Sequence, residues 1–315
     1  MSTQDLFLVT AASGKTGAPA VAALRERGLR VRALVHRVDQ RSERLAGLGA
    51  EIVQADLLDF DAVSSAVDGV SGAYLCYPID PGRLLEATSI FAQAASEAGV
   101  RAVVNMSQIS ARREAKSHAA QQHWIAERLL DRTTMMTTHL RPTFFAEWLA
   151  KEWSPDKVGW TRRHDAAVLR LPFGHGRHAP ISAADQGRFV AAVLADPAPH
   201  DRQIYPLTGP IELDHHEIAD VLSRQLGIPV RYEPIEISAF AEALTAQGYS
   251  PFLVQHLSSV AQDYRNGVFA GASDLVEAVT GAAAMTVEQI AAAHRGRFDE
   301  PGRAEVPSAA HRATA

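Results

Sequence analysis

The stretch Leu6-Phe7-Leu8-Val9-Thr10-Ala11-Ala12-Ser13-Gly14-Lys15-Thr16-Gly17 joins a short apolar strand to a helix through a loop that contains two glycines. A helix that starts at such a loop points free N–H groups and the positive end of its dipole at the strand end, where phosphate groups bind. We expect Gly14 to let the backbone approach a pyrophosphate and Gly17 to allow close packing of the helix on the sheet. The stretch therefore predicts a dinucleotide-binding loop. Its expected contact residues are Ala11, Ser13, Gly14, Lys15, Thr16 and Gly17.

The loop departs from the common form G-x-x-G-x-x-G at its first position. Ala11 stands where the first glycine would be, and we expect its methyl group to restrict the turn and weaken the cofactor contact. The run Gly14-Lys15-Thr16 is superficially similar to a nucleoside-triphosphate loop, but the first glycine of that motif would fall at Val9. A triphosphate loop is therefore excluded.

Short β-rich runs alternate with stretches of helical length through the first 150 residues. Parallel strands joined by helical crossovers are covered on both faces, so the alternation predicts an α/β fold with a doubly wound parallel sheet. The expected strands are Leu6–Val9, Val31–Val35, Ile52–Val53, Ala73–Cys76, Ala102–Met106 and Thr138–Arg141, and the expected helices span about 14–27, 39–47, 59–67, 83–98 and 118–131.

The regular alternation stops after residue 150. The stretch from Trp153 to Gly176 is rich in Pro, Gly, Trp and basic residues and is expected to be irregular. A helix is expected at Asp185–Leu194 and a strand at Gln203–Leu207. The pattern Asp214-His215-His216-Glu217 predicts a capping box that opens a helix ending at Gly227.

The same change in pattern suggests the domain organisation. We expect a nucleotide-binding domain over residues 1–152 and a smaller, mostly C-terminal substrate domain over residues 153–297, from which about 183–210 return to the first domain. Residues 298–315, with two prolines and many small polar residues, are expected to form a flexible tail.

The composition limits the class of protein. The 315 residues carry 31 Lys and Arg against 36 Asp and Glu, a formal net charge of −5, with 47% apolar residues and one cysteine. One cysteine cannot form an intrachain disulfide or a cysteine-rich metal site, and mild acidity argues against nucleic acid as the primary ligand. No stretch approaches the ~18 apolar residues that span a bilayer. We expect a cytoplasmic protein whose primary ligand is not nucleic acid and that has no membrane partner.

The end of the second expected strand selects between the two nicotinamide dinucleotides. Arg37 follows Leu34-Val35-His36, about 20 residues past the glycine loop, where sites specific for NAD carry an acid for the ribose hydroxyls. An arginine there would pair with the 2′-phosphate of NADP, so NADP(H) is expected over NAD(H). The alternative is a solvated charge at a strand end. Asp56, after the third strand, is a candidate partner for the adenine amino group.

The nicotinamide is expected at the carboxyl ends of the later strands, beside the point where the strand order reverses. Each candidate also has a simpler interpretation: Tyr77 and Phe144 as core aromatics, and Ser107 as the cap of a turn. The aromatic residues after the sixth strand suit the wall of an apolar substrate pocket, although helix–sheet packing would also use them. The cofactor candidates are Tyr77, Pro78, Met106, Ser107, Pro142 and Thr143, and the pocket candidates are Phe144, Phe145 and Trp148.

Several segments together resemble the NmrA-like branch of the atypical short-chain dehydrogenases/reductases. They are AASGKTG, LVHR, ADLLD, VVNMSQIS, HLRPTFF and YPLTGPIELDHHEIADVLSRQLG, between the first strand and about residue 297. The resemblance implies a Rossmann domain, a smaller substrate domain, a cleft between the two and a preference for NADP(H). The resemblance does not decide between an enzyme and a regulator, because the family includes reductases of quinones and isoflavonoid-type compounds and also dinucleotide sensors that regulate other proteins.

The tyrosine–lysine pair of the catalytic short-chain dehydrogenases tests that division. In the pair, lysine lowers the pKa of the tyrosine that exchanges a proton with the substrate. If Glu127 aligns with the acid that commonly follows the lysine, Ala119 takes the tyrosine position and His123 the lysine position. Classical carbonyl–alcohol chemistry is therefore not expected. A quinone or an enone can take its proton elsewhere, and the candidate catalytic residues are His123, His118 and Ser107, with Lys116 a weaker one.

Metal binding is not expected from the histidine-rich runs Gly174–His178 and Asp214–Glu217. His175 and His178 lack an identifiable third ligand, and capping explains the acids of the second run. Cys76 is expected to be a small buried residue near the nicotinamide, with redox sensing as the alternative.

Two functions are therefore open. One is an NADPH-dependent reductase of a small conjugated or quinone-like substrate. The other is a non-catalytic NADP(H) sensor that binds a regulatory protein partner, and either can be a monomer or a homodimer.

Overall fold

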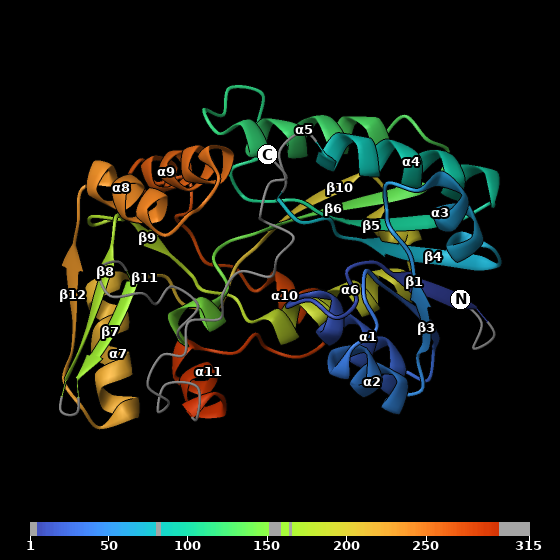
Figure 1. Ribbon diagram of the computed structural model, residues 1–315. Helices are drawn as coiled ribbons and strands as arrows, with labels where there is room; N and C mark the ends of the chain where they lie inside the picture. Colours follow the sequence, from blue (N-terminus) through green and yellow to red (C-terminus); the bar gives the residue numbers. More distant parts are fainter. Residues whose placement is uncertain (1–4, 80–82, 151–158, 164–165, 296–315) are drawn as a thin grey trace.

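The computed structural model of the chain describes residues 5–79, 83–150, 159–163 and 166–295 (Figure 1). Within these residues, no helix is both long and apolar enough to cross a membrane. The expected tail at 298–315 and the aromatic residue Trp153 lie outside the described residues.

Seven parallel strands form the central sheet in the order β10-β6-β5-β4-β1-β2-β3. The order reverses between β1 and β4, and ligands of doubly wound sheets bind outside the carboxyl ends of the strands at such a point, a region that we call the crevice. The expected doubly wound parallel sheet is confirmed. The strands are β1 (Leu6–Val9), β2 (Arg30–Val35), β3 (Glu51–Gln54), β4 (Val70–Leu75), β5 (Ala102–Met106), β6 (Met136–Pro142) and β10 (Gln203–Leu207).

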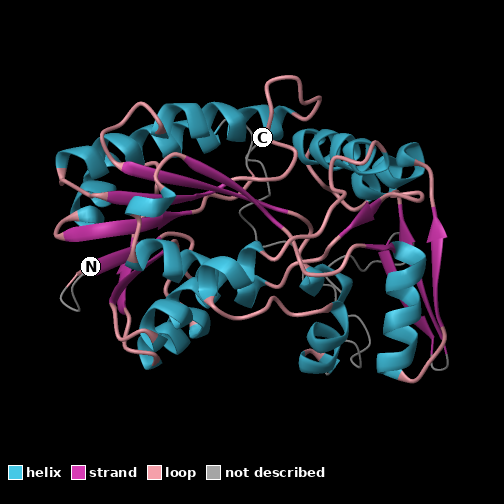
Figure 2. Ribbon diagram, turned by 180° about the vertical axis from the view of Figure 1, so that it is seen from behind, coloured by secondary structure: helices cyan, strands magenta, loops and turns pink. Residues whose placement is uncertain are grey.

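Helices cover both faces of this sheet (Figures 1 and 2). Alternate residues of β1 point to opposite faces: Phe7 and Val9 join the core under α1 and α6, and Leu6 and Leu8 join the core under α3 and α4. All four residues are buried, as a parallel strand requires. The covering helices are α1 (Gly17–Glu26), α2 (Gln40–Gly47), α3 (Phe60–Val67), α4 (Arg83–Glu97), α5 (His118–Leu130) and α6 (Ala183–Ala195).

The first turn of α1 is held tightly against the preceding loop. The helix starts at Gly17, later than the expected start at 14. A Cβ atom at Gly17 would lie 2.3 Å from the carbonyl oxygen of Ala11 and 2.8 Å from the Cα atom of Ala12, so the helix touches the loop itself. Ala11 adopts a left-handed φ of 47°, which costs an L-residue about 1–2 kcal/mol. The position that carries glycine in the common motif thus keeps a glycine-like backbone here.

A later part of the chain completes the sheet and its helical cover. Strand β10 pairs in parallel with β6 at the sheet edge, and α6 packs against α1. The two helices approach so closely that a Cβ atom at Gly187 would lie 2.6 Å from the carbonyl carbon of Pro19. Helix α6 therefore helps to hold the first turn of α1, and β10 completes the edge of the sheet.

Most of the remaining elements form a second group beside the carboxyl ends of the sheet (Figure 2), whereas η2 (Ala198–His200) contacts the start of β6 and α10 (Leu275–Thr280) packs on α6. The capping box predicted at the start of α7 is confirmed: Asp214 accepts from the N–H of Glu217, whose carboxylate accepts from the N–H of Asp214, and the helix ends at Gly227 with a φ of 71°. The elements are η1 (Ala146–Ala150), β7 (Gly159–Arg163), β8 (Ala166–Leu171), β9 (Arg177–His178), η2 (Ala198–His200), β11 (Leu213–Asp214), α7 (His215–Leu226), β12 (Val230–Pro234), α8 (Ile237–Ala246), α9 (Pro251–Arg265), α10 (Leu275–Thr280) and α11 (Val287–Ala293).

The expectation of irregular structure between Trp153 and Gly176 is wrong for the part that the structure describes. Strands β7 and β8 pair antiparallel there, and β12 adds to β8 in parallel to make a three-stranded sheet. Along β8, Ala167, Leu169 and Leu171 are buried, while the residues between them are half-buried. Val168 and Arg170 lie on the more open face of the short strand, and β12, some 60 residues later in the chain, supplies its parallel partner.

Helices α5 and α9 meet through buried polar side chains. The hydroxyl of Ser117, which caps α5, lies 2.7 Å from Nδ1 of His256 on α9. Burial, reinforced by His256, lowers the pKa of His123 to about 3, and burial lowers the pKa of His256 to about 4. Arg112 forms two hydrogen bonds of 2.8 and 2.6 Å with the buried carboxylate of Asp263. With these lowered pKa values, His123 and His256 are neutral at neutral pH.

Substitution of Gly17 by Ala tests the contact between α1 and its loop. The added methyl group must displace backbone atoms, so we expect the free energy of unfolding to fall by about 1–3 kcal/mol. Gly47→Ala is the matched control, because a Cβ atom at Gly47, in α2, has no heavy atom within 4 Å. It should stabilise the protein by about 0.5–1 kcal/mol through helix propensity. Urea unfolding measures both, and an equal response of the two variants would contradict the contact.

The α5–α9 histidines predict a loss of stability in mild acid. In the unfolded chain a histidine titrates near pH 6.5, so between about pH 6.5 and 4 the unfolded state binds protons that the folded state does not. Stability should fall by roughly 2 kcal/mol per buried neutral histidine between pH 7 and 5. Urea midpoints at the two pH values should differ less in His123→Asn than in the wild type. The exposed His36→Asn variant should behave as the wild type does, and an unchanged difference in His123→Asn would contradict the assignment.

Candidate functional site

The N-terminus of α1 faces the crevice without a side-chain cap. Thr16 occupies the N-cap position, but its side chain makes no capping hydrogen bond, and its Oγ1 lies 3.8 Å from Sγ of Cys76 instead. No acidic residue stands in the first turn. The positive end of the helix is therefore not neutralised by the side chains of its own first turn, which suits an anionic ligand.

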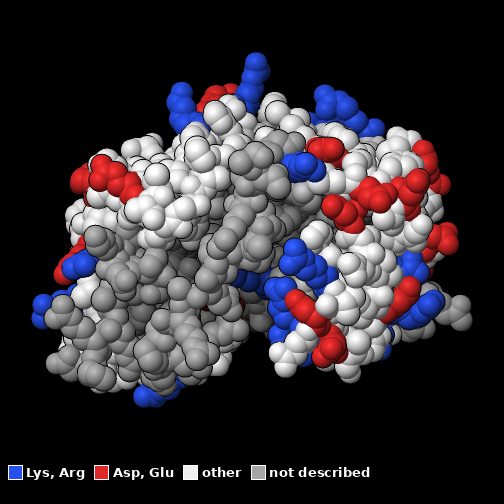
Figure 3. Space-filling view, in the orientation of Figure 1, with Lys and Arg blue, Asp and Glu red and all other residues white. Residues whose placement is uncertain are grey.

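Arg37 differs from the neighbouring arginines. It is exposed after β2, and its guanidinium makes no hydrogen bond or ion pair with the part of the chain that the structure describes. Arg32 pairs with Glu51 at 2.9 Å, and Arg41 pairs with Asp39 at 2.7 Å. Figure 3 shows Lys and Arg side chains grouped beside the hollow near the centre of the face drawn in Figure 1. Arg37 thus follows the second strand with its cation available to a ligand.

The side chain of Asp56 lies after β3, exposed, and its Oδ1 accepts a hydrogen bond of 3.0 Å from the N–H of Leu58. Lys15 is exposed in the loop, with its ammonium 5.8 Å from the ring centre of Trp148. The cation–π distance brings the predicted phosphate loop and a predicted pocket residue together.

A buried polar network ties the ends of β1, β4 and β5 together. Thr10 donates its hydroxyl proton to the carbonyl of Cys76 and accepts from the N–H of Cys76. Gln186, on α6, donates to the phenol oxygen of Tyr74 at 2.8 Å and to the sulfur of Met106 at 3.1 Å. Burial raises the pKa of the Cys76 thiol, so the thiol stays protonated and is a poor candidate for a reactive thiolate.

Tyr77 and Pro78 follow the same strand end. Tyr77 packs beside the core under α3 and α4, and Pro78 is exposed. At the end of β6, Thr143 is buried: its N–H donates to the carbonyl of Leu207 and its hydroxyl to the carbonyl of Ala179 at 2.8 Å. The buried Pro142 precedes it.

The hydroxyl of Ser107 is hydrogen-bonded to the buried ion pair of Glu127 and Arg141. Its hydroxyl donates to the carboxylate of Glu127 at 2.6 Å, and Arg141 donates to both oxygens of that carboxylate at 2.8 and 2.6 Å. Glu127 is fully buried. The proton of Ser107 therefore points at Glu127, and only the lone pairs of its oxygen remain to contact a ligand.

The other two candidate catalytic residues lie against α9. His123 is buried, and its Nδ1 has no hydrogen-bond partner among the described residues. His118 is exposed at the start of α5, with its ring centre 6.4 Å from that of Phe252. Neither these histidines nor Ser107 belongs to the side chains that line the aromatic cavity described next. Their catalytic roles stay predictions.

The three predicted pocket residues Phe144, Phe145 and Trp148 do come together. They line a cavity of about 30 Å³, and the ring of Phe144 packs 5.2 Å from Trp148 and 5.1 Å from Phe173. A space of that size holds about one water molecule, so a larger ligand needs the rings to move. We call this space the aromatic cavity. Its lining residues are Phe144, Phe145, Trp148, Leu149, Leu171, Phe173, His178, His215 and Phe240.

Two histidines of the aromatic cavity meet a buried tyrosine. Nδ1 of His178 lies 2.5 Å from the phenol oxygen of Tyr264, and Nδ1 of His215 lies 3.3 Å from it. Burial lowers the pKa of His178 well below its usual value and that of His215 to about 3, and it raises the pKa of Tyr264. Among the described residues, no three His, Cys, Asp or Glu side chains gather to hold a metal ion.

These residues were not predicted as part of the site. The sequence pattern shows His178 and His215 only as members of two histidine-rich runs, and Tyr264 stands in an amphipathic helix without any local motif. Their meeting depends on the packing of β9, α7 and α9, which no spacing along the chain displays.

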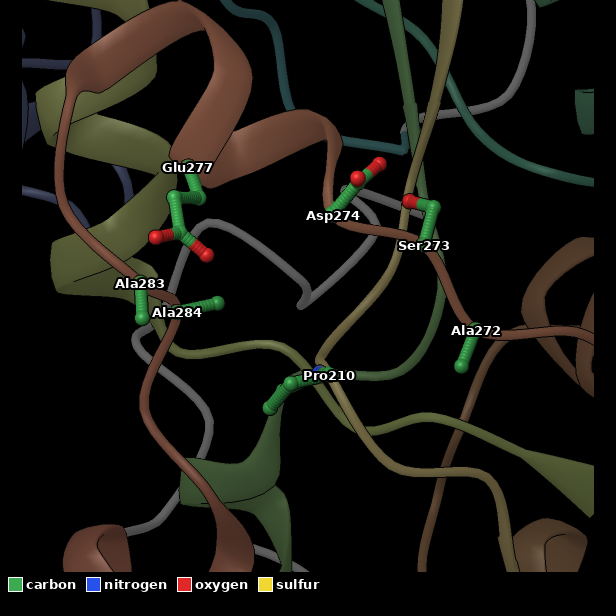
Figure 4. Close-up of a pocket in the computed structure, with 7 residues that line it drawn as sticks. All are labelled: Pro210, Ala272, Ser273, Asp274, Glu277, Ala283 and Ala284. Atoms are coloured by element: carbon green, nitrogen blue, oxygen red, sulfur yellow. The ribbon is translucent and has the colours of Figure 1, made fainter.

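A second cavity, of about 290 Å³, opens beside α10. Figure 4 shows the carboxylate of Glu277 pointing from α10 toward it. None of the predicted cofactor or pocket residues lines it, and two carboxylates repel a pyrophosphate. The lining residues are Pro210, Ala272, Ser273, Asp274, Glu277, Ala283 and Ala284.

Known proteins similar to this chain include two reductases of nearly the same length. An NAD(P)H azoreductase from Xenophilus azovorans is 27% identical over 295 residues, which make up 93% of this chain and 99% of that protein. A (4-alkanoyl-5-oxo-2,5-dihydrofuran-3-yl)methyl phosphate reductase from Streptomyces griseus is 28% identical, again over 93% of this chain and 99% of that protein.

Among solved structures, an NADPH-dependent quinone oxidoreductase from Escherichia coli in complex with NADPH shares the fold, with a TM-score of 0.77 and 24% identity over 92% of this chain and 99% of that chain. The NmrA-like family matches residues 3–286, which include the central sheet and most of the second group of elements. The resemblance read from the sequence is thereby confirmed: the chain belongs to the NmrA-like family.

Proposed function

We propose that the protein is an NADPH-dependent oxidoreductase that reduces a small conjugated, quinone-like substrate. The observation that carries the proposal is the position of the aromatic cavity directly after β6, beside the strand ends that the uncapped α1 faces. A dinucleotide bound along those strand ends and a planar ring in the cavity would be neighbours. The similar azoreductase and quinone oxidoreductase support the same reaction class.

The phosphate end of the cofactor fits the residues present. The backbone of the loop from Ala11 to Gly17, with the uncapped helix start, would hold the pyrophosphate, and Arg37 would pair with the 2′-phosphate. Asp56 lies after the next strand, at the adenine side. When bound, NADPH supplies the hydride.

The nicotinamide end has fewer polar groups to offer. Thr143 and Pro142 at the end of β6, Met106 and Ser107 at the end of β5, and Tyr77-Pro78 after β4 would surround the ring. If Glu127 aligns with the acid of the Tyr-x-x-x-Lys motif, the buried Ala119 and His123 take the tyrosine and lysine positions, and the substrate is then one that accepts hydride without that pair. Quinones and other strongly conjugated acceptors meet this condition.

Oxidation of NADPH, followed by the loss of its absorbance across a panel of quinones, enones and azo compounds, tests the proposed function. Turnover above background with at least one acceptor supports it. Tight NADPH binding without any turnover would instead favour a non-catalytic NADP(H) sensor, the second function expected from the sequence. The absence of the Tyr–Lys pair is the observation that keeps this second function open.

Replacement of Arg37 by Asp tests the preference for NADP(H). The change removes a charge-assisted contact of about 1.5–3 kcal/mol, so the affinity for NADPH should fall about 10- to 100-fold, while that for NADH should change far less. Arg27→Asp, the same change of charge at the far end of α1, is the matched control and should leave both affinities unchanged. Titrations of intrinsic fluorescence measure the affinities of the wild type and both variants for NADPH and NADH. Equal losses for NADPH and NADH in Arg37→Asp would refute the assignment.

A further inference from the structure

Three buried polar side chains meet beside the aromatic cavity. The phenol oxygen of Tyr264 lies between Nδ1 of His178 and Nδ1 of His215, at 2.5 and 3.3 Å. The two imidazole rings are nearly parallel, with their centres 5.5 Å apart. All three side chains are buried, yet none of them forms an ion pair with a described residue. Apolar side chains would fill this part of the core at a lower cost of desolvation. Packing alone therefore does not explain why three polar side chains lie here.

This trio connects the cavity with the strand ends. His178 and His215 line the aromatic cavity, and the ring of Tyr264 packs 5.8 Å from that of Phe144. Ala179, the residue after His178, accepts the hydroxyl of Thr143 at the end of β6. At the other end of the trio, His215 is followed by His216, which is exposed. His178 thus lies next in the chain to the residue that meets the end of β6, and His215 lies at the start of α7 next to the exposed His216.

The hydrogen count of the trio fixes its protonation pattern. A phenol has one proton, so Tyr264 can donate to only one of the two Nδ1 atoms that face it and must accept from the other. The two neutral imidazoles therefore hold opposite tautomers: one carries its proton on Nε2, and the other has a bare Nε2. In each ring Nε2 points away from the phenol, because Nδ1 faces it. The trio is a chain with a proton donor at one end and an acceptor at the other.

We propose that His215, Tyr264 and His178 form a charge-neutral proton relay that protonates a quinone-like substrate in the aromatic cavity. The proposal rests on the proposed function. Hydride from NADPH adds to the quinone, which becomes a hydroquinone monoanion, and NADP⁺ is left. His178 gives its Nε2 proton to the anionic oxygen and takes the proton of Tyr264 on Nδ1. Tyr264 takes the Nδ1 proton of His215, and His215 takes a proton from water on Nε2.

The sum of these steps is quinone, NADPH and one proton giving hydroquinone and NADP⁺. Each member of the relay gives one proton and receives one, so no charge stays in the buried trio. This matters because burial lowers the pKa of both histidines and raises the pKa of Tyr264, which disfavours an imidazolium or a phenolate as a resting state. After one turnover both tautomers are inverted, and the starting pattern returns only when each ring has released the proton of one nitrogen and bound a proton on the other.

Tyr264→Phe tests the relay, because it removes one oxygen and keeps the ring. Tyr232→Phe is the matched control: its ring centre lies 5.1 Å from that of His215, but its hydroxyl donates to the carbonyl of Leu171. The first readout needs no cofactor. In ¹⁵N-labelled protein, long-range ¹H–¹⁵N spectra of the imidazoles should show two neutral rings of opposite tautomer, in the wild type and in Tyr232→Phe. Two rings of the same tautomer in the wild type would overturn the proposal.

The second readout is kinetic, with the best acceptor of the panel. We expect Tyr264→Phe to lower kcat by about 10²-fold, the usual contribution of a positioned acid, without changing the affinity for NADPH. In mixtures of H₂O and D₂O, a plot of kcat against the fraction of D₂O should be curved for the wild type, which indicates that several protons move together. The plot should be linear for Tyr264→Phe. Tyr232→Phe should keep both the rate and the curvature.

The remaining outcomes separate the relay from the function on which it rests. If the wild type reduces an acceptor but Tyr264→Phe and Tyr232→Phe are equally active, the relay is overturned and the proposed function stands. If the wild type reduces no acceptor, both are overturned. Should Tyr264→Phe fail to fold, His178→Gln gives the same test, because an amide keeps polar atoms in place but cannot pass a proton from one atom to another.

Discussion

The structure depends on how closely the first helix approaches the loop before it. With only hydrogen at Gly17, α1 begins within contact of the Ala11 carbonyl, and a Cβ atom would stand 2.3 Å from that oxygen. This contact directs the start of α1 at the strand ends and brings its side chains under α6, which closes over Pro19 at Gly187. A wider approach would turn the N–H groups of the first turn away from the crevice and open the packing between α1 and α6. Ala11 holds a left-handed backbone to make the contact, so the geometry is kept even where the residue type does not favour it.

Polar and aromatic side chains occupy different strand ends around the crevice. The strand ends of β1, β4 and β5 are joined by hydrogen bonds among buried groups such as Thr10, Gln186 and Glu127, whose partners are fixed by the sheet. Such a network gives a rigid floor, since breaking any one bond leaves a buried group unpaired. The wall after β6 is made of packed aromatic rings around a cavity of about 30 Å³.

The fold followed from local patterns, and the site only partly did. Strands such as Leu6–Val9 and the capping box at Asp214 were predictable because each is decided by residues within a few positions. The strand Ala166–Leu171 was missed because its parallel partner lies about 60 residues later, beyond the reach of any local pattern. Ser107 and His123 were chosen from their places on β5 and α5, but nothing nearby in sequence reveals that Glu127 takes the proton of Ser107 or that α9 covers His123. No sequence pattern around Tyr264 indicates a site residue, because its contacts form only when α9 packs against β9 and α7.

The packing of α6 on α1 also bears on how the protein is made. Strands β1 to β6 and helices α1 to α5 leave the ribosome first, but one side of the sheet lacks part of its cover and one edge lacks a strand until residues 183–207 emerge. Until then Phe7, Val21 and Leu24, which belong to the core shared with α6, have only part of their final surroundings. The nascent chain therefore carries a nearly complete central sheet with one apolar face partly exposed. This state lasts while some 50 further residues are added, which takes several seconds at about 5–20 residues per second.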